Sequence, residues 1–434
     1  MLPFVSRFGA VFVFALTAST AHAATYYVAT TGSDGNPGSL SRPWKTLQHA
    51  ADRITAGDTI RVRGGNYAGA NFETSGTATR PIVLQAYTGE TPVINANNPV
   101  TPDGINLEGA SYMTVKGFTV NGRTRAGIRA VTCDHVTIRD NRLDRNGTWG
   151  IFTGFCDDLL IEHNVASRSV QQHGIYVSNS GDRPVIRRNF VWGNNQAGIH
   201  MNGDASEGGD GIISGALVEM NTINGNGVAG ASGINMDGVQ DSLIRNNLLY
   251  DNHASGISLY QIDGGGPSTG NSVLNNTVIV ASNGRWALNL QDGARDTTLA
   301  NNILYNLHSF RGVLDISPDS LPGLSSDYNS AMNRFTTNGG DTILTLAQWR
   351  QQTGLDAHTF VATPTQLFVN ASRNDYHLSA SSPAVDHGAT LADVTTDLAG
   401  IARPQGAYYD IGAYEFAAAG VMPESLDEDA LPPE

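Results

Sequence analysis

A repeat of about 23 residues occupies the centre of the chain and restricts the folds open to it. Gly-Ile pairs begin at residues 104, 127, 150, 174, 198, 233 and 256, and a degenerate copy, Ala287-Leu288, follows. Each copy holds a short alternating run, a polar turn and a second run such as VTIRDN (136–141). Alternation is typical of strands with one buried face, and no copy has a helical pattern. The period predicts a parallel β-helix whose coils hydrogen-bond to the coils above and below.

Two side-chain columns follow from this register. The second run of successive copies closes on an asparagine, and stacked amides can hydrogen-bond along such a column, which predicts a structural ladder of Asn141, Asn164, Asn189, Asn221 and Asn247. Cys133 and Cys156 each follow their repeat glycine by six residues. Equivalent positions on adjacent coils stand about 4.8 Å apart, within the reach of a disulfide. We therefore predict a Cys133–Cys156 bond in an oxidising compartment.

The remaining segments differ from the repeat. Residues 1–23 combine Arg7, a short apolar core and an Ala-His-Ala motif, which is typical of a secretory signal peptide and predicts a periplasmic or extracellular protein. Residues 24–103 are expected to form an N-terminal cap and the first coils, with a capping helix at Pro43–Ile54. The coils are expected over 104–315 and a C-terminal capping segment over 316–416, with a short helix in Thr342–Thr353. Residues 417–434 form an acidic tail that we expect to be disordered.

Charge and hydropathy exclude two classes of partner. The formal net charge is −14, and Lys45 and Lys116 are the only lysines. Nucleic-acid binding depends on clustered Lys and Arg, so no nucleic-acid partner is expected. No segment after the signal peptide approaches the roughly 20 apolar residues of a membrane span. We expect a monomer without a membrane partner.

Two segments resemble a known group of proteins. TYYVATTGSDGNPGSLSRPWKTLQHAADRITAGDTIRVRGGNY (25–67) resembles the opening of secreted right-handed β-helix proteins, including pectate lyases of polysaccharide lyase family 9. SSPAVDHG (381–388) and RPQGAYYDIGAYEF (403–416) resemble the C-terminal segment of many bacterial β-helix proteins. The resemblance implies export and an all-β, right-handed parallel β-helix with a short N-terminal capping helix and an irregular C-terminal cap. It does not fix a substrate, because this fold hosts lyases, hydrolases, epimerases and adhesins.

The resemblance to family 9 stops at the catalytic base, which is a lysine in that family. Lys45 belongs to the cap segment. Lys116 belongs to a column in which the signs of charge mostly alternate, which predicts a salt-bridge ladder of Lys116, Arg139, Glu162, Arg187, Glu219 and Arg245. The family's catalysis is therefore not carried over to this chain.

Alignment of the copies on Gly-Ile predicts which outward-pointing side chains lie on the same sheet, because every second residue of a strand points to the same face. The residue after Ile gives the column Asn106, Arg129, Phe152, Tyr176, His200, Asn235, Ser258 and Asn289. Two positions later the column is Glu108, Val131, Gly154, Ser178, Asn202, Asp237, Tyr260 and Gln291. Six of these side chains are expected to be contiguous, and we call them the polar patch: Tyr176, His200, Asn202, Asn235, Asp237 and Tyr260.

The polar patch has the groups that a lyase needs on a uronic acid polymer. β-Elimination removes the C5 proton and protonates the glycosidic oxygen, so it requires a base, an acid and a group that neutralises the carboxylate. We expect His200 as base, Tyr176 as acid, and Asn202 or Arg129 at the carboxylate, with Asn235, Asp237 and Tyr260 as further substrate-binding residues. His173 is a second catalytic candidate at the margin. This arrangement is similar to that of several alginate lyases and uronan epimerases.

Two long loops are expected to leave the stack beside the polar patch, NGDASEGGDGIISG (202–215) and QIDGGGPSTG (261–270). Asp204, Glu207 and Asp210 lie in the first loop, and hard oxygen ligands suit Ca²⁺, which would neutralise a substrate carboxylate. A calcium site is therefore an expectation, although acidic residues in glycine-rich loops are also common turn formers.

Three functions remain open beside the lyase that cleaves an acidic polysaccharide. A glycoside hydrolase needs two carboxylates, for which Asp237 with Asp204 or Asp263 are candidates. A uronan C5-epimerase shares the first step of the lyase. A non-catalytic carbohydrate-binding or surface β-helix would use Tyr176, Tyr260 and His200 only as stacking surfaces.

Overall fold

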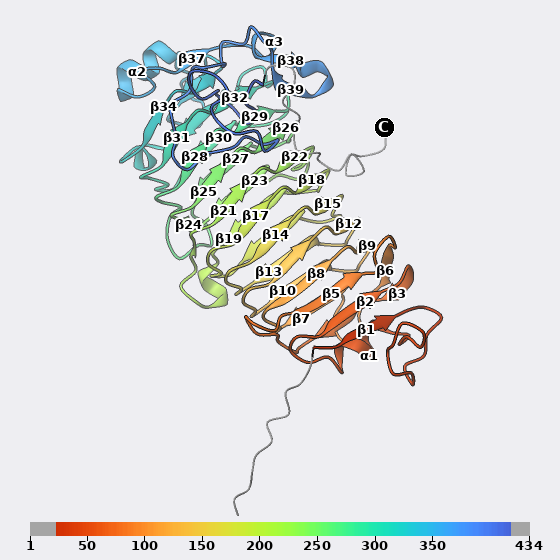
Figure 1. Cartoon of the computed structure of the whole chain (residues 1–434). Coiled ribbons are helices and arrows are strands. Elements are labelled where there is room, and N and C mark those ends of the chain that lie inside the picture. Colours follow the sequence, from red (N-terminus) through yellow and green to blue (C-terminus); the bar gives the residue numbers. More distant parts are fainter. Residues whose placement is uncertain (1–22, 418–434) are drawn as a thin grey trace, which may run out of the picture.

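Three parallel sheets run the length of the molecule and form the walls of a single coil stack (Figure 1). The structure is a computed structural model that describes residues 23–417. The predicted signal peptide and acidic tail therefore lie outside the described residues, apart from Ala23 and Ala417 at their boundaries. No helix within 23–417 is long and apolar enough to cross a membrane. The all-β, right-handed parallel β-helix predicted from the repeat is confirmed.

Each coil contributes one strand to each wall. Sheet 1 has twelve strands: β1 (Thr25–Val28), β2 (Thr59–Val62), β5 (Ile82–Ala86), β8 (Met113–Lys116), β11 (Thr137–Arg139), β14 (Leu160–Glu162), β17 (Val185–Arg187), β21 (Leu217–Glu219), β25 (Leu243–Arg245), β28 (Ser272–Leu274), β31 (Thr298–Ala300) and β34 (Ser325–Asp327). Sheet 2 has eleven strands: β4 (Ala70–Phe72), β7 (Ile105–Glu108), β10 (Ala126–Val131), β13 (Trp149–Gly154), β16 (Ile175–Ser178), β19 (Ile199–Asn202), β23 (Ile234–Asp237), β27 (Ile257–Tyr260), β30 (Leu288–Leu290), β33 (Leu314–Ile316) and β36 (Phe335–Thr336).

The third wall and the smaller elements complete the chain. Sheet 3 has twelve strands: β3 (Gly65–Ala68), β6 (Pro92–Ala96), β9 (Thr119–Asn121), β12 (Arg142–Asp144), β15 (Val165–Ser167), β18 (Phe190–Trp192), β22 (Thr222–Asn224), β26 (Leu248–Tyr250), β29 (Thr277–Val280), β32 (Ile303–Asn306), β35 (Ser330–Ala331) and β37 (Phe360–Val361). Two small pairs are β20 (Ile213–Ser214) with β24 (Val239–Gln240), and antiparallel β38 (Phe368–Asn370) with β39 (Asp375–Leu378). The helices are α1 (Leu47–Ala51), α2 (Leu346–Thr353), α3 (Pro364–Leu367) and the 3₁₀ turns η1 (Ala205–Glu207), η2 (Pro318–Ser320) and η3 (Ala371–Arg373).

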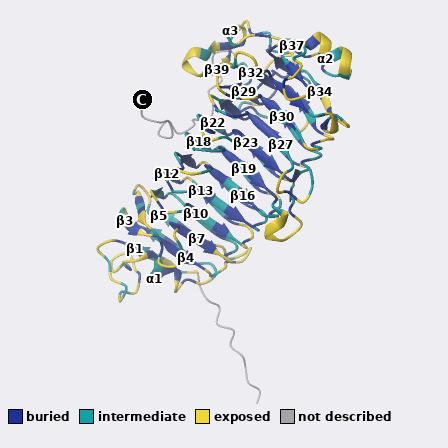
Figure 2. Ribbon diagram, turned by 180° about the vertical axis from the view of Figure 1, so that it is seen from behind, coloured by how far each residue is buried: buried dark blue, intermediate teal, exposed yellow. Residues whose placement is uncertain are grey.

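The Gly-Ile repeat sets the interior of sheet 2. Ile151, Ile175 and Ile199 pair in register on successive coils and are fully buried. The glycine before each isoleucine is required because neighbouring atoms leave no room for a side chain. A Cβ at Gly174 would come within 2.5 Å of Val191 Cγ1 and 2.9 Å of the Gly198 carbonyl oxygen. Figure 2 shows the sheets mostly buried and the exposed residues concentrated in the connections and caps.

The asparagine ladder is confirmed and is longer than predicted. Asn141 Nδ2 donates to Asn164 Oδ1 at 3.1 Å, and Asn189 Nδ2 donates to Asn221 Oδ1 at 3.0 Å. The same contact continues through Asn276, Asn302 and Asn329. A second ladder, between sheet 3 and sheet 2, contains Asn194, Asn226 and Asn252.

Five of the six members of the charged column on sheet 1 form ion pairs with one another, as predicted, and the sixth, Lys116, pairs outside the column. Glu162 lies between Arg139, at 3.3 Å, and Arg187, at 2.8 Å. Arg245 contacts Glu219 at 2.6 Å, and Lys116 contacts Asp140 at 3.5 Å. Lys116 therefore has a structural partner on sheet 1 and does not contribute to sheet 2.

The predicted Cys133–Cys156 disulfide is wrong. The two side chains are buried on adjacent coils, as the register required, but both are free thiols. Cys133 Sγ lies 3.1 Å from the Val131 carbonyl oxygen, and Cys156 Sγ lies 3.3 Å from that of Gly154. Each sulfur also lies near a carbonyl oxygen of the preceding coil, that of Leu107 at 3.5 Å and that of Ala130 at 3.4 Å, and Cys156 Sγ accepts the Cys133 backbone N–H.

Two boundaries also differ from the predictions. The capping helix is only α1, which begins after Thr46, because Trp44 instead pairs with the first strand through its backbone N–H to the Tyr27 carbonyl oxygen. The coils extend past residue 315, since β34, β35 and β36 still pair with the coil before them. The helix predicted in Thr342–Thr353 is confirmed as α2.

Candidate active site on sheet 2

The register of sheet 2 brings the polar patch together as predicted. Tyr176 of β16 pairs with His200 of β19, and His200 pairs with Asn235 of β23. Asn202, Asp237 and Tyr260 pair in the neighbouring column. Interior residues such as Val177 and Met201 point into the core, so the patch residues between them face outward.

A stacked tyrosine–histidine pair forms the centre of the patch. The rings of Tyr176 and His200 lie 4.9 Å apart with an interplanar angle of 16°. His173, which is buried, meets Tyr176 edge-on at 5.1 Å and His200 at 4.6 Å. Three groups able to transfer or donate protons therefore share one contact surface on two adjacent coils.

Hydrogen bonds orient these side chains. The Ala197 backbone N–H donates to His173 Nδ1 at 3.1 Å, and His173 Nε2 lies 3.1 Å from His200 Nδ1. Asn202 Nδ2 donates to the Tyr176 hydroxyl oxygen at 3.2 Å. Within the described residues, His200 Nε2 and Asn202 Oδ1 are shielded from solvent and have no hydrogen-bond partner.

Burial moves the pKa values of the three groups away from their ordinary ranges. Desolvation lowers the pKa of His200 to about 4 and lowers the pKa of His173 well below its usual value, with a smaller effect from His200. Desolvation raises the pKa of Tyr176, and hydrogen bonds from Asn202 and Ser178 oppose this shift. Near neutral pH the imidazoles are uncharged and the tyrosine keeps its proton.

Asp237 has a structural role that the sequence did not reveal. It is buried, and its carboxylate accepts the backbone N–H groups of Ile262, Asp263 and Gly264 at 2.8–3.1 Å. These bonds fasten the loop 261–270 to sheet 2. The Asp237 carboxylate thus has a structural role, and substrate binding by this side chain stays a prediction.

The two long loops lie side by side, as predicted from their positions. Ala205 N–H donates to the Asp263 carbonyl oxygen, and Gly265 N–H donates to that of Gly211, at 2.9 and 2.8 Å. Strands β20 and β24 pair at the same edge. The exposed residues around η1 form the projection beside β19 (Figure 2).

The predicted calcium ligands do not converge. No group of three His, Cys, Asp or Glu side chains within residues 23–417 is arranged to hold a metal ion. Asp204 instead accepts the Ser206 N–H and hydroxyl, and Asp210 accepts the Ile212 N–H. Glu207 is exposed at the end of η1. Asp204 and Asp210 thus act as turn formers, and calcium binding by Asp204, Glu207 and Asp210 stays a prediction.

The structure places the remaining predicted residues at the edges of the patch. Arg129 lies two coils from Tyr176, donates to Asn106 Oδ1 at 2.8 Å and is paired with Glu108, so its charge is already matched. Asn235 donates to the Tyr260 hydroxyl. Desolvation, with a further contribution from Asp237, raises the pKa of Tyr260.

Trp149 and Phe152 extend the patch along the coil axis and were missed as site residues. The Phe152 ring lies 5.4 Å from that of Tyr176, and the Trp149 ring lies 5.9 Å from it. Trp149 Nε1 donates to Gln172 Oε1 at 2.8 Å. The position before each Gly-Ile pair could have predicted Trp149 as a site residue, because Trp149 and His173 occupy this position in successive copies.

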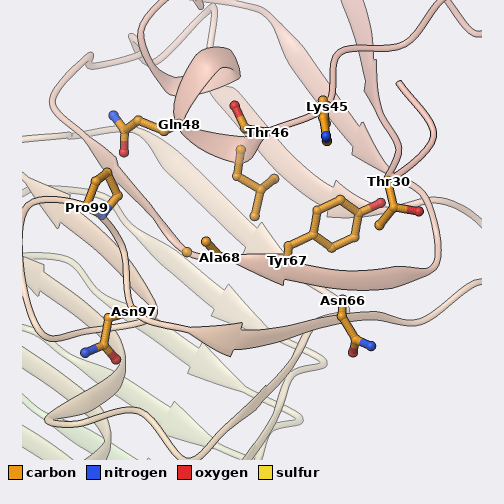
Figure 3. Close-up of a pocket in the computed structure, with 11 residues that line it drawn as sticks. Thr30, Lys45, Thr46, Gln48, Asn66, Tyr67, Ala68, Asn97 and Pro99 are labelled. Carbon is orange, nitrogen blue, oxygen red and sulfur yellow. The ribbon is translucent and has the colours of Figure 1, made fainter. Parts of the chain in front are cut away.

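A cavity of about 560 Å³ lies elsewhere, between α1, β3 and residues 97–99 near the N-terminal cap (Figure 3). Its lining includes Lys45, Gln48, Asn66 and Tyr67. Gln48 is bound to Asn71, and the Tyr67 hydroxyl donates to the Arg63 carbonyl oxygen. Lys45 and Tyr67 are the titratable residues of the lining, and the Tyr67 O–H is already donated to the backbone.

Two family models match consecutive parts of the chain. The Pel9A-like right-handed β-helix region matches residues 26–171, and a right-handed β-helix region matches residues 163–317. Pectate lyase PEL9 of Emericella nidulans is 27% identical over 202 residues, which are 46% of this chain and 46% of that protein. The uncharacterized protein YwoF of Bacillus subtilis is 27% identical over 430 residues, with 82% of this chain and 91% of YwoF covered.

A solved structure shows the same fold. The crystal structure of pectate lyase Pel9A has a TM-score of 0.59 and 17% identity, and the alignment covers 90% of this chain and 96% of that one. Together with the family models, it establishes a pectate lyase-like β-helix fold. At this identity the likeness concerns the fold, and the chemistry must be judged from the side chains on sheet 2.

Proposed function

We propose that this right-handed β-helix protein, with its Pel9A-like N-terminal region, is an exported lyase that cleaves a uronic acid-containing polysaccharide by β-elimination. The observation that carries the proposal is the stacked Tyr176–His200 pair on the outer face of sheet 2. The named activity of the relative PEL9, a pectate lyase, supports the same substrate class.

The pair offers two groups that can take part in β-elimination. The reaction moves the C5 proton to the enzyme and supplies a proton to the glycosidic oxygen. The Tyr176 oxygen already accepts a hydrogen bond from Asn202, so its own O–H is available to a substrate. His200 has one ring nitrogen held by His173 and the other without a partner among the described residues. Trp149 and Phe152 provide apolar ring surfaces beside the pair, suited to sugar rings.

The alternative of a glycoside hydrolase has less support. That reaction needs two carboxylates placed about the scissile bond. The Asp237 carboxylate accepts three backbone N–H groups of the loop 261–270, and Asp204 accepts from Ser206, so of the three candidates only Asp263 is exposed. The patch is thus better supplied with neutral proton-transfer groups than with free carboxylates.

Incubation with pectate, alginate and glucuronan tests the proposal. We expect absorbance from unsaturated uronates with at least one of them. Reducing ends without that absorbance would indicate a hydrolase, and deuterium entering C5 from solvent without cleavage would indicate an epimerase. Binding without any of these would leave a carbohydrate-binding β-helix. Parallel reactions with Ca²⁺ and with a chelator measure whether a cation assists at the substrate carboxylate.

Matched variants assign the activity to the pair. Tyr176→Phe and His200→Ala are expected to lower kcat/KM by about 10²–10⁴-fold, the usual loss when a group that transfers a proton or stabilises developing charge is removed. Tyr112 and His135 form a second stacked pair, at 4.5 Å and 17°, outside sheet 2. Tyr112→Phe and His135→Ala should leave turnover unchanged. Equal losses from both pairs would show that the effect is structural.

A further inference from the structure

Three groups form a directional hydrogen-bond chain behind the outer face of sheet 2. The Ala197 backbone N–H contacts His173 Nδ1, and His173 Nε2 contacts His200 Nδ1, each at 3.1 Å. The first group is an amide, which is always a donor. The identity of that first donor fixes the role of every following nitrogen.

The assignment follows from the tautomers of neutral imidazole, in which one nitrogen donates and the other accepts. His173 Nδ1 must accept from Ala197, so the proton of His173 resides on Nε2. That proton is donated to His200 Nδ1, which must therefore be the acceptor. The remaining proton of His200 resides on Nε2.

Both imidazoles are in the neutral form that this reasoning requires. Desolvation lowers the pKa of His200 to about 4, and it lowers the pKa of His173 well below the ordinary value. The alternative tautomer of His200 would place two N–H groups against each other at His173, or two at Ala197. Leaving a buried polar group unpaired costs about 1–3 kcal/mol, which favours the arrangement described.

We propose that His173 is a positioning residue that holds His200 with its proton on Nε2, so that His200 offers the substrate a hydrogen-bond donor and not a base. This reverses the role expected for His200 from the sequence. The inference rests on the proposed lyase function only for the identity of the acceptor, an oxygen of the uronate. A donor there can hydrogen-bond to an oxygen of the uronate carboxylate and stabilise the charge that develops on it. Tyr176, which keeps its proton near neutral pH, is the group of the pair that can donate to the glycosidic oxygen.

Unpartnered atoms beside the pair fit such a ligand. His200 Nε2 and Asn202 Oδ1 are shielded from solvent, and neither has a partner within the described residues. The two residues alternate on the same face of β19. A sugar supplies both complements, since its oxygens accept from the Nε2–H and its hydroxyl groups donate to the amide oxygen.

Nitrogen NMR of the full-length protein, labelled with ¹⁵N-histidine, tests the tautomer without substrate or turnover. The resonances of His200 are identified by their loss in His200→Gln. In the wild type we expect a protonated Nε2 and an unprotonated Nδ1 for His200 near neutral pH. A protonated Nδ1 on His200 would overturn the proposal.

Two variants of His173 test whether it sets the tautomer. His173→Gln keeps an acceptor for Ala197 and a donor for His200, so the wild-type tautomer should persist. His173→Glu offers acceptors only and should draw a proton onto His200 Nδ1. A His173→Glu spectrum with an unprotonated Nδ1 on His200 contradicts the positioning role. Circular dichroism confirms that each variant is folded.

Turnover then separates this inference from the proposed function. His200→Gln retains an N–H donor and should keep at least 10-fold more activity than His200→Ala, whereas Tyr176→Phe should be as inactive as His200→Ala or more so. Equal loss in His200→Gln and His200→Ala contradicts the donor role. If no polysaccharide is cleaved but the NMR result holds, the lyase proposal fails and the tautomer assignment stands.

Discussion

The asparagine ladder gives the sharpest prediction about stability, and Asn221 is its most informative member. The side chain is fully buried. Its Oδ1 accepts from the backbone and side-chain nitrogens of Asn189 at 2.9 and 3.0 Å, and its Nδ2 donates to the Ile186 carbonyl oxygen and Asn247 Oδ1 at 2.9 and 3.0 Å. Asn221→Ala removes all four hydrogen bonds and leaves their partners buried.

The expected cost follows from the net value of one buried hydrogen bond. At about 1 kcal/mol each, four bonds sum to about 4 kcal/mol, and groups left without a partner raise the cost further. Guanidinium unfolding followed by far-UV circular dichroism measures this loss as a shift of the midpoint at unchanged slope. We expect a destabilisation of about 4 kcal/mol or more in the free energy of unfolding.

Asn195→Ala is the matched control. Asn195 is half-buried, and its one side-chain hydrogen bond, to the Gln171 carbonyl oxygen, is exposed to solvent, so its loss should cost less than about 1 kcal/mol. If Asn221→Ala were no more destabilised than Asn195→Ala, the ladder would not stabilise the coils, and the reasoning from its hydrogen bonds would be refuted.

Three further predictions concern titration and the loop. The folded pKa of His200, about 4, lies below the ordinary 6.5. The contribution of neutral His200 to the free energy of unfolding is therefore fully present above pH 6.5 and is lost as pH falls toward 4, and at 1.36 kcal/mol per pKa unit it amounts to roughly 3 kcal/mol. His200→Gln should flatten this part of the pH dependence of unfolding. Desolvation raises the pKa of Asp410 to about 6, so its contribution is present below 3.8 and lost as pH rises to 6, and Asp410→Asn should remove a slope of opposite sign. Asp237→Ala should speed hydrogen exchange of residues 262–264 while the amides of β23 stay protected, and unchanged exchange would contradict its role as the anchor of the loop.

The repeat made the coils and the columns of sheet 2 predictable, because strands stacked in register carry equivalent positions into contact. Tyr176 and His200 could be paired by counting alone. The same counting brought Cys133 and Cys156 together but could not supply the direction of their sulfurs, which is set by the carbonyls at the end of each strand.

The parts that escaped prediction depend on irregular backbone. His173 precedes its strand, so the alternation rule does not place its ring, and its contact with Ala197 arises in a turn. The three amides bound by Asp237 come from the loop 261–270, whose path no periodicity specifies. Asp204 and Asp210 were expected to share an ion, but each is satisfied by an amide two residues later in its own turn.

The two amide ladders have a consequence for how such a chain can diversify. One fastens the corner after sheet 1 from Asn141 to Asn329, and the other fastens the corner after sheet 3 from Asn194 to Asn252. Within residues 23–417 no asparagine ladder of this kind follows sheet 2. The distance from the repeat glycine to the ladder asparagine grows from 14 residues (Gly233 to Asn247) to 23 (Gly198 to Asn221), whereas the distance from that asparagine to the next glycine varies only between 9 and 12. Insertions and deletions at the end of the sheet 2 strands can therefore be accommodated without disturbing the stacked coils. Mutation can thus change the loops that border Tyr176 and His200 while the strands that align these two residues stay the same.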